Sequence, residues 1–487
     1  MSCILCIDIG TSRIKAALVN EKGMLVSLHS ERVDRAASPD TQDVSVWRKT
    51  TVSLLKGMSD EIKKSAPLAV SLTGNMHALL GIGNDGLPVA DAILWCSNEA
   101  GAESDELIRK YPDFAKKYGN LPAPVFTLPK MLQFARQKPE LYAKTKCFLQ
   151  PKDDIGFFLT GTFATDPSDA SGMMPFLPDE RKWDIEMIRE LGLDPEKFPA
   201  VTESAEYRGY ITKKAAELTG LPEGLPVVCG AGDLATAALG CGASGGVLSL
   251  TLGTAGQLLA SGPRGRWHGL AGKLFVFAHA DPDFDLFLGS VPGGGFSYEW
   301  EAKQRNLTME DFFRHAGQAS LQKDLPIYLP YLLGRGAPYM DYIPAAGWYG
   351  ISAKHSLNGL CRATVFGPLA ALRQSADLLA ELTETNYHSV VLQSLACREK
   401  SVQQTASALF PQKKMIPENP EASLLGAAIL GMAAVKKYSS ISEAIRNMVH
   451  FNDLPESDCT EKEIADFLFR RYLEIANSLK LPVMSKE

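Results

Sequence analysis

The spacing of apolar residues predicts strands at the start of the chain. Three short apolar runs, 3–9, 14–19 and 24–29, are separated by Gly10-Thr11-Ser12 and by a polar turn over 20–23. Short apolar runs bounded by turn residues are typical of strands, so this segment is predicted to form a β-meander.

The spacing then changes to that of a helix. Within 47–64, Val52, Leu55, Met58 and Ile62 fall on one stripe, and a short apolar strand follows at 68–72. Strands therefore alternate with helices, which predicts the α/β class.

Two segments near the middle of the chain suggest how it is divided. An apolar strand over 226–229 runs into Gly230-Ala231-Gly232-Asp233, where a helix is predicted to begin, and the glycine-rich segment 240–246 follows. Because 487 residues exceed what one core organises, we expect two domains, 1–243 and 244–487.

A short sequence echo relates the two halves. Leu250-Thr251-Leu252-Gly253-Thr254 resembles Ile7-Asp8-Ile9-Gly10-Thr11 and also follows an apolar run. The repeat predicts two related domains, each of which offers a phosphate-sized turn to a common cleft. Thr251 stands where Asp8 stands, so only the first turn supplies a carboxylate.

Composition narrows the class of protein. The net charge is −6 without a long Lys/Arg run, which argues against nucleic acid or an anionic membrane surface as a partner. The start has no basic region, and the apolar run 426–435 is too short to span a bilayer. Nine scattered cysteines form no disulfide framework, so we expect a soluble, cytoplasmic protein.

The first turn carries candidate phosphate chemistry. Backbone N–H groups and hydroxyls of Gly10, Thr11 and Ser12 suit phosphate oxygens, Lys15 adds a positive charge, and Asp8 is a candidate Mg²⁺ ligand. An ordinary β-hairpin would explain the same residues, and only the second copy of the turn favours the functional interpretation.

The segment Gly230-Ala231-Gly232-Asp233-Leu234-Ala235 imitates a dinucleotide fingerprint. Such a site also needs an acidic residue about twenty positions further on for the ribose. Because no Asp or Glu occurs between Asp233 and Asp281, a nicotinamide dehydrogenase is disfavoured. Asp233 is then either a catalytic base or a plain helix cap, and the pattern alone does not choose between them.

Sugar recognition has candidates after the strand at 68–72. Asn75, Met76 and His77 supply an amide, a thioether and an imidazole, and Trp95 follows another apolar run. Single residues of these types are more often packing residues than ligands, so the pattern alone promotes none of them.

Taken together, these segments resemble the FGGY carbohydrate kinases, and within them the xylulokinase-like branch, over essentially the whole chain. The residues that carry the resemblance are Asp8 to Ser12 with Lys15, Gly74 to His77, Pro151 to Asp153, Thr165 to Gly172, Gly232-Asp233, Leu252 to Thr254, Tyr328 to Leu332 and Glu421 to Ala428. The run Thr165 to Gly172 is the most specific.

The resemblance implies an actin-like fold of two RNase H-like domains that close on ATP and Mg²⁺. The implied reaction is transfer of the γ-phosphoryl group to a terminal hydroxyl of a small sugar, a ketose with D-xylulose as the first candidate, and a homodimer is a further expectation. By this resemblance, Asp233 is the catalytic base and contacts the sugar, and Asp8 holds the metal. The residues expected to contact the nucleotide are Gly10, Thr11, Ser12, Lys15, Gly253, Thr254 and Gly426. The residues expected to line the sugar pocket are Asn75, Met76, His77 and Trp95.

The chain also departs from the family pattern. Trp95 is followed by Cys96-Ser97-Asn98-Glu99 where an Asp and an Arg are usual, and Gln393 to Ala396 replaces a Gly-Gly motif. These departures keep alternatives open: a kinase for ribulose, sedoheptulose or glycerol, or a catalytically weak sugar-sensing protein. An actin-like assembly or chaperone ATPase ranks last, since it would need neither 165–172 nor Met76-His77.

Overall fold

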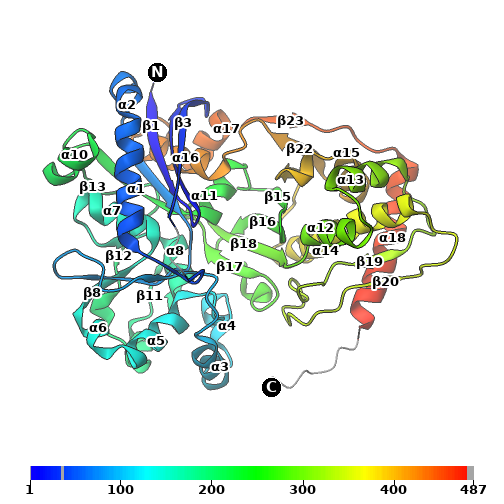
Figure 1. Cartoon of the computed structure of the whole chain (residues 1–487), viewed down its shortest axis with the longest axis horizontal. Helices are drawn as coiled ribbons and strands as arrows, with labels where there is room; N and C mark the ends of the chain where they lie inside the picture. Colours follow the sequence, from blue (N-terminus) through cyan, green and yellow to red (C-terminus); the bar gives the residue numbers. More distant parts are fainter. Residues whose placement is uncertain (1, 35–37, 480–487) are drawn as a thin grey trace.

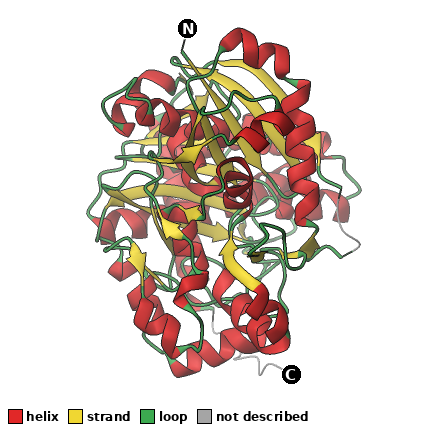
Figure 2. Cartoon of the chain, turned by 90° about the vertical axis from the view of Figure 1, so that its left-hand side faces the viewer, coloured by secondary structure: helices red, strands yellow, loops and turns green. Residues whose placement is uncertain are grey.

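The computed structural model describes residues 2–34 and 38–479, and it contains two large sheets with helices packed around them (Figures 1 and 2). The first sheet has six strands in the order β13-β14-β5-β1-β2-β3. Their bounds are Tyr207–Tyr210 (β13), Pro226–Gly232 (β14), Val70–Gly74 (β5), Cys3–Ile9 (β1), Arg13–Asn20 (β2) and Leu25–Arg32 (β3). The predicted meander is thus confirmed.

The second sheet has seven strands in the order β17-β18-β16-β15-β21-β22-β23. Their bounds are Phe275–Ala278 (β17), Phe284–Val291 (β18), Gly256–Pro263 (β16), Val247–Leu252 (β15), Ser389–Gln393 (β21), Lys413–Pro417 (β22) and Phe451–Asp453 (β23). This sheet begins directly after the glycine-rich segment at 240–246. The exact division at residue 243 stays a prediction.

The two sheets repeat one pattern of strand directions. In the first, β1 is antiparallel to β2 and parallel to β5, which is parallel to β14. In the second, β15 is antiparallel to β16 and parallel to β21, which is parallel to β22. Asp8 pairs with Lys15, and Thr251, at the equivalent place, pairs with Gln257. The sequence echo therefore marks equivalent strands of two related α/β units.

One predicted helix is divided in two. The segment 47–64 falls on α1 (Val44–Gly57) and α2 (Ser59–Ser65), which are separated at Met58 with φ −98° and ψ 9°. The apolar stripe continues across this break, so periodicity alone does not reveal it. Other helices of the chain include α7 (Pro151–Thr160), α8 (Pro167–Met173), α10 (Lys213–Thr219), α11 (Asp233–Gly240), α13 (Met309–Gln318), α14 (Leu357–Thr383), α15 (Lys400–Leu409), α16 (Ala422–Ala434), α17 (Ile441–Met448) and α18 (Cys459–Ser478).

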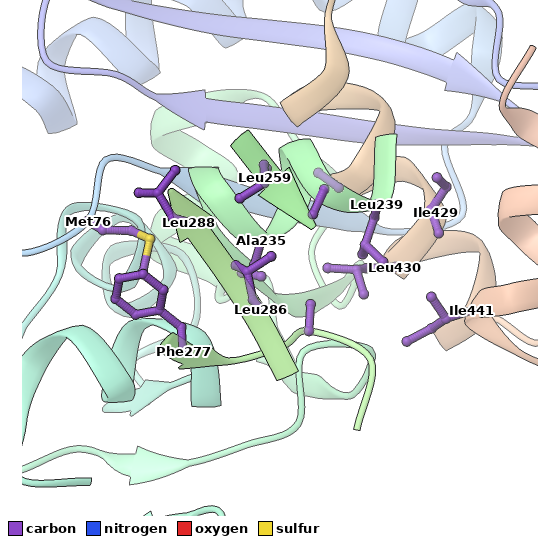
Figure 3. Close-up of a cluster of buried hydrophobic side chains, with 14 of the residues drawn as sticks. Met76, Ala235, Leu239, Leu259, Phe277, Leu286, Leu288, Ile429, Leu430 and Ile441 are labelled. Carbon is purple, nitrogen blue, oxygen red and sulfur yellow. The ribbon is translucent and has the colours of Figure 1, made fainter. Parts of the chain in front are cut away.

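A buried cluster joins the two halves across the middle of the molecule. Ala235 and Leu239 of α11 pack with Ile429 and Leu430 of α16, and Figure 3 shows β16 and β18 adding Leu259, Leu286 and Leu288 to the same group. Gly426 of α16 allows this contact, because a Cβ there would lie 1.8 Å from the carbonyl oxygen of Thr236. Helix α16, although late in the sequence, thus packs on the helix that begins at Asp233.

Across the two ranges covered by the structure, no helix combines the length and the apolar character that crossing a bilayer requires.

Candidate active site

A cavity of about 620 Å³ lies where the two halves meet. On one side it is bounded by the carboxyl ends of the parallel strands β1, β5 and β14, the usual location of ligand sites in open α/β sheets. The first half contributes Gly10, Thr11, Asn75, Met76, His77, Trp95, Val125, Phe126, Asp233 and Leu234; the second half contributes Thr254, Ala255, Gln257, Phe275, Phe277, Leu288, Ser290 and Pro292.

Two glycines bring Asp233 to the cavity. Gly230 has φ +72°, and a Cβ there would lie 1.8 Å from the carbonyl oxygen of Leu72 on the neighbouring strand. A Cβ on Gly232 would lie 2.6 Å from the sulfur of Met76. The helix begins at Asp233 as predicted, but its N-cap is Gly232, without a side-chain capping bond. Asp233 is therefore the first residue of the helix rather than its N-cap, and its role as a base stays a prediction.

The carboxyl group of Asp233 lies in surroundings that shift its pKa toward neutrality. Burial, assisted by the nearby Asp8 carboxylate, raises its pKa to about 7, while the backbone N–H of Leu234 acts in the opposite direction. Burial likewise raises the pKa of Asp8 to about 6, although the Lys15 ammonium opposes that rise. Asp233 lines the cavity, whereas Asp8 does not; the Asp8 carboxylate is near enough to contribute to the raised pKa of Asp233.

The first glycine turn meets the predicted sugar pocket at the rim. Gly10 and Thr11 line the cavity, and Thr11 Oγ1 accepts a hydrogen bond of 3.3 Å from Nε1 of Trp95. The Trp95 side chain is 46% exposed, so it forms part of the entrance. Ser12 is exposed next to the turn and is not among the lining residues.

Two predicted nucleotide residues lie away from the cavity lining. Lys15 Nζ forms an ion pair of 2.6 Å with Oε2 of Glu421. Gly426 lies at the contact of α11 with α16, against Thr236. The packing of these helices accounts for the glycine, and its contact with a nucleotide stays a prediction.

The second turn is held by the chain around it. Thr254 lines the cavity, whereas Gly253 does not. Gly253 packs closely on Gly295, because a Cβ on Gly295 would lie 1.8 Å from the carbonyl oxygen of Gly253. Ser394 Oγ accepts a hydrogen bond of 3.1 Å from the backbone N–H of Leu252. Ser394 has φ +78°, a left-handed conformation that favours glycine, so the serine keeps a glycine-like backbone after β21.

The predicted sugar residues are assembled around an aromatic wall. His77 stacks on Phe277 with ring centroids 5.6 Å apart and meets Phe126 edge-on at 5.0 Å. Burial lowers the pKa of His77 to about 3, so its imidazole is neutral. Asn75 donates from Nδ2 to the carbonyl oxygen of Ile9 at 2.8 Å, and its own Oδ1 has no hydrogen-bond partner among the described residues.

Sequence reasoning missed the second half's share of this pocket. Phe275 and Phe277 stand two residues apart on β17 and therefore face the same side of the sheet. Their alternation was visible, but an apolar alternation looks the same whether it faces a core or a ligand cavity. Gln257 and Ser290 add polar groups on the adjacent strands β16 and β18.

Comparison with known families identifies the architecture. Residues 3–240 match the N-terminal domain of the FGGY family of carbohydrate kinases, and residues 295–435 match its C-terminal domain. The chain belongs to the FGGY family of carbohydrate kinases. It is accordingly a sugar kinase with the actin-like fold, for which ATP is the implied phosphoryl donor.

Individual relatives include several xylulose kinases and a gluconokinase. The xylulose kinase of Lactococcus lactis is 26% identical over 465 residues, which cover 93% of this chain and 92% of that protein. The xylulose kinase of Escherichia coli is 29% identical over 384 residues, covering 77% of this chain and 78% of the relative. A gluconokinase of Bacillus licheniformis is 23% identical over 472 residues, covering 92% and 90%.

Solved structures share the whole fold. A ligand-bound xylulose kinase from Lactobacillus acidophilus superposes with a TM-score of 0.89 at 22% identity, covering 98% of each chain. Glycerol kinase from Plasmodium falciparum with ADP gives 0.87 at 19% identity, covering 99% of each chain. Because kinases with different named substrates share the fold, the sugar has to be inferred from the pocket.

Proposed function

We propose that this FGGY kinase transfers the γ-phosphoryl group of ATP to a terminal hydroxyl of a neutral ketose, with D-xylulose as the first candidate. The proposal rests on the position and the raised pKa of the Asp233 carboxyl group. This group lines a cavity shared by both halves, between two glycine-threonine turns, with a pKa of about 7. A carboxylate of that basicity accepts a hydroxyl proton efficiently near neutral pH.

In this proposal the protein's own groups position the reactants. Asp233 accepts the proton of the attacking hydroxyl, while the turns at Gly10-Thr11 and Gly253-Thr254 hold phosphate oxygens through backbone N–H groups. Asp8 offers a carboxylate beside the first turn, and burial raises its pKa to about 6 although the Lys15 ammonium opposes the rise. Carboxylate oxygen is the type of donor that a hard cation prefers. Asp8 would hold Mg²⁺, which neutralises charge on the transferring group when bound.

The cavity favours a neutral sugar over a sugar acid such as gluconate. Among the described residues that line it there is no Lys or Arg, and His77 is uncharged. Lys130 lies behind the wall, but its ammonium donates to the carbonyl oxygens of His77, Val125 and Phe126. A substrate carboxylate would therefore lose water without gaining a cationic partner.

ADP release in the presence of ATP and Mg²⁺ tests the proposal with D-xylulose, ribulose, sedoheptulose, glycerol and gluconate. We expect the largest kcat/KM for xylulose and the smallest for gluconate. Asp233→Ala should lower kcat about 10²-fold to 10⁴-fold. Exposed Asp60 on α2 offers a matched control, Asp60→Ala, which should leave turnover unchanged.

Three outcomes would overturn it. ATP turnover that does not depend on sugar, or turnover that Asp233→Ala leaves intact, would contradict the assigned reaction. Calorimetric sugar binding without any ADP release would instead favour a sugar-sensing protein of the same fold.

A further inference from the structure

Helix α8 lies directly behind the turn that carries Asp233. Its N-cap, Asp166, accepts hydrogen bonds from the backbone N–H groups of Ser168, at 2.9 Å, and of Asp169, at 3.4 Å. All three residues are fully buried or nearly so, and none of them lines the cavity. The groups that cap this helix therefore lie outside the cavity lining.

One hydroxyl connects this helix to the catalytic turn. Ser168 Oγ accepts a hydrogen bond of 3.0 Å from the backbone N–H of Gly232, the residue before Asp233. The same hydroxyl donates to Oδ2 of Asp166 at 2.6 Å, and Ser204 Oγ donates to that oxygen at 2.9 Å. Because a serine has a single hydroxyl hydrogen, its donation to Asp166 turns an acceptor lone pair toward Gly232.

A buried charge cluster holds Asp166 in turn. Lys152 Nζ lies 2.7 Å from Oδ1 of Asp153, 3.0 Å from Oδ1 of Asp166 and 3.1 Å from Oδ2 of Asp169, and Arg208 Nη1 lies 3.2 Å from Asp153 Oδ1. All five side chains are 0% exposed. Burial raises the pKa of Asp169, while the Lys152 ammonium acts in the opposite direction and Asp166 adds to the rise. Two cationic side chains therefore face three buried carboxyl groups.

Such a cluster is poorly explained by stability alone. Burying ion pairs costs several kcal/mol per ion in lost hydration, and apolar replacements of equal volume are often as stable. The cluster is also placed unusually close to the catalytic turn, since a Cβ on Gly232 would lie 3.0 Å from Oδ1 of Asp169. The location of the cluster therefore suggests that it fixes the geometry of the turn before Asp233 rather than adding to the free energy of folding.

We propose that Ser168, oriented by Asp166, is a positioning residue that fixes the backbone of Gly232 and hence the direction in which the Asp233 carboxylate enters the cavity. The inference rests on the proposed role of Asp233 as the base. Lys152 and Asp169 hold Asp166 in place from the other side, which makes the run 165–172 part of the base's support.

Ser168→Ala tests this relay with ADP release as the assay. We expect kcat to fall at least about tenfold while the KM for the sugar changes less than about twofold, because a displaced base impairs the reaction more than binding. Ser407→Ala is the matched control: it removes another buried serine hydroxyl, one that donates to the carbonyl oxygen of Pro455 at 3.0 Å, far along the chain on α15. This control should keep kcat within twofold of the parent, even if both variants unfold at a lower temperature.

A double-mutant cycle separates positioning from general damage. In an Asp233→Asn background the base is absent, so adding Ser168→Ala should leave the residual turnover unchanged. Equal losses in both backgrounds, or a loss no greater than that of Ser407→Ala, would overturn the proposal for Ser168 alone. If Asp233→Asn itself retained full turnover, the proposed function would fail instead.

Discussion

The ionisation of Asp233 should set the lower pH limit of catalysis. With a pKa of about 7, its carboxyl group is ionised for about one tenth of molecules at pH 6, half at pH 7 and nine tenths at pH 8. Only the ionised form accepts a proton, so kcat/KM for the sugar should rise about tenfold from pH 6 to pH 8 and then level off. The ATP concentration is kept well below its KM, so that the pH profile reports the pKa of Asp233 in the unliganded protein.

A substitution and a direct titration check the cause of this pKa. Because the Asp8 carboxylate contributes to the rise after burial, Asp8→Asn should lower the pKa of Asp233 while leaving it above its ordinary value. The ¹³C carboxyl resonances of aspartate-labelled, ligand-free protein measure it, with the Asp233 signal assigned by its absence from Asp233→Asn. A pKa near 4 in the parent protein, or one that Asp8→Asn leaves unchanged, would refute the reasoning.

Three further predictions concern stability and binding. Gly426→Ala should reduce the free energy of unfolding in urea by about 1–3 kcal/mol, because its Cβ would meet the Thr236 carbonyl oxygen at 1.8 Å. The matched control is Gly317→Ala on α13, which has open space around it and should be neutral or slightly stabilising. Lys152→Met should cost about 3–5 kcal/mol in the same assay, since it leaves buried carboxylates unpaired; a loss below 1 kcal/mol would contradict the cluster's charge pairing. Trp95→Ala should raise the KM for the sugar about tenfold with an unchanged melting temperature, because Trp95 lies half-exposed at the rim; an unchanged KM would remove it from the pocket.

Much of the fold was readable because its signals are local. The strands at 3–9 and 226–229 and the helix that begins at Asp233 follow from apolar runs that end at glycine. The echo at 250–254 correctly indicated a second sheet of the same topology. By contrast, the break at Met58 was missed, since a helix that ends and restarts on one stripe leaves the apolar spacing intact.

The site was readable where a residue type has few structural uses. The pattern left Asp233 as either a base or a helix cap and the family resemblance favoured the base, and Asp233 does line the cavity. A glycine within a helix is ambiguous, because Gly426 serves close packing on α11 as well as it could serve a nucleotide. The aromatic wall of Phe126, Phe275 and Phe277 could not be predicted, since only the tertiary structure brings 126 next to 275–277.

The contacts of the late segment bear on how the cleft can close. Glu421 pairs with Lys15, Gly426 packs on Thr236, and Tyr438 Oη donates to the carbonyl oxygen of Glu21. These contacts tie 421–438 to the first sheet, although the segment belongs to the second half by sequence. A rotation of residues 244–487 as one body would break all of them and open the buried α11–α16 contact. If the two sheets close over ATP and sugar, we therefore expect 421–438 to move with the first sheet and to keep Asp233 and its helix fixed while the second turn approaches.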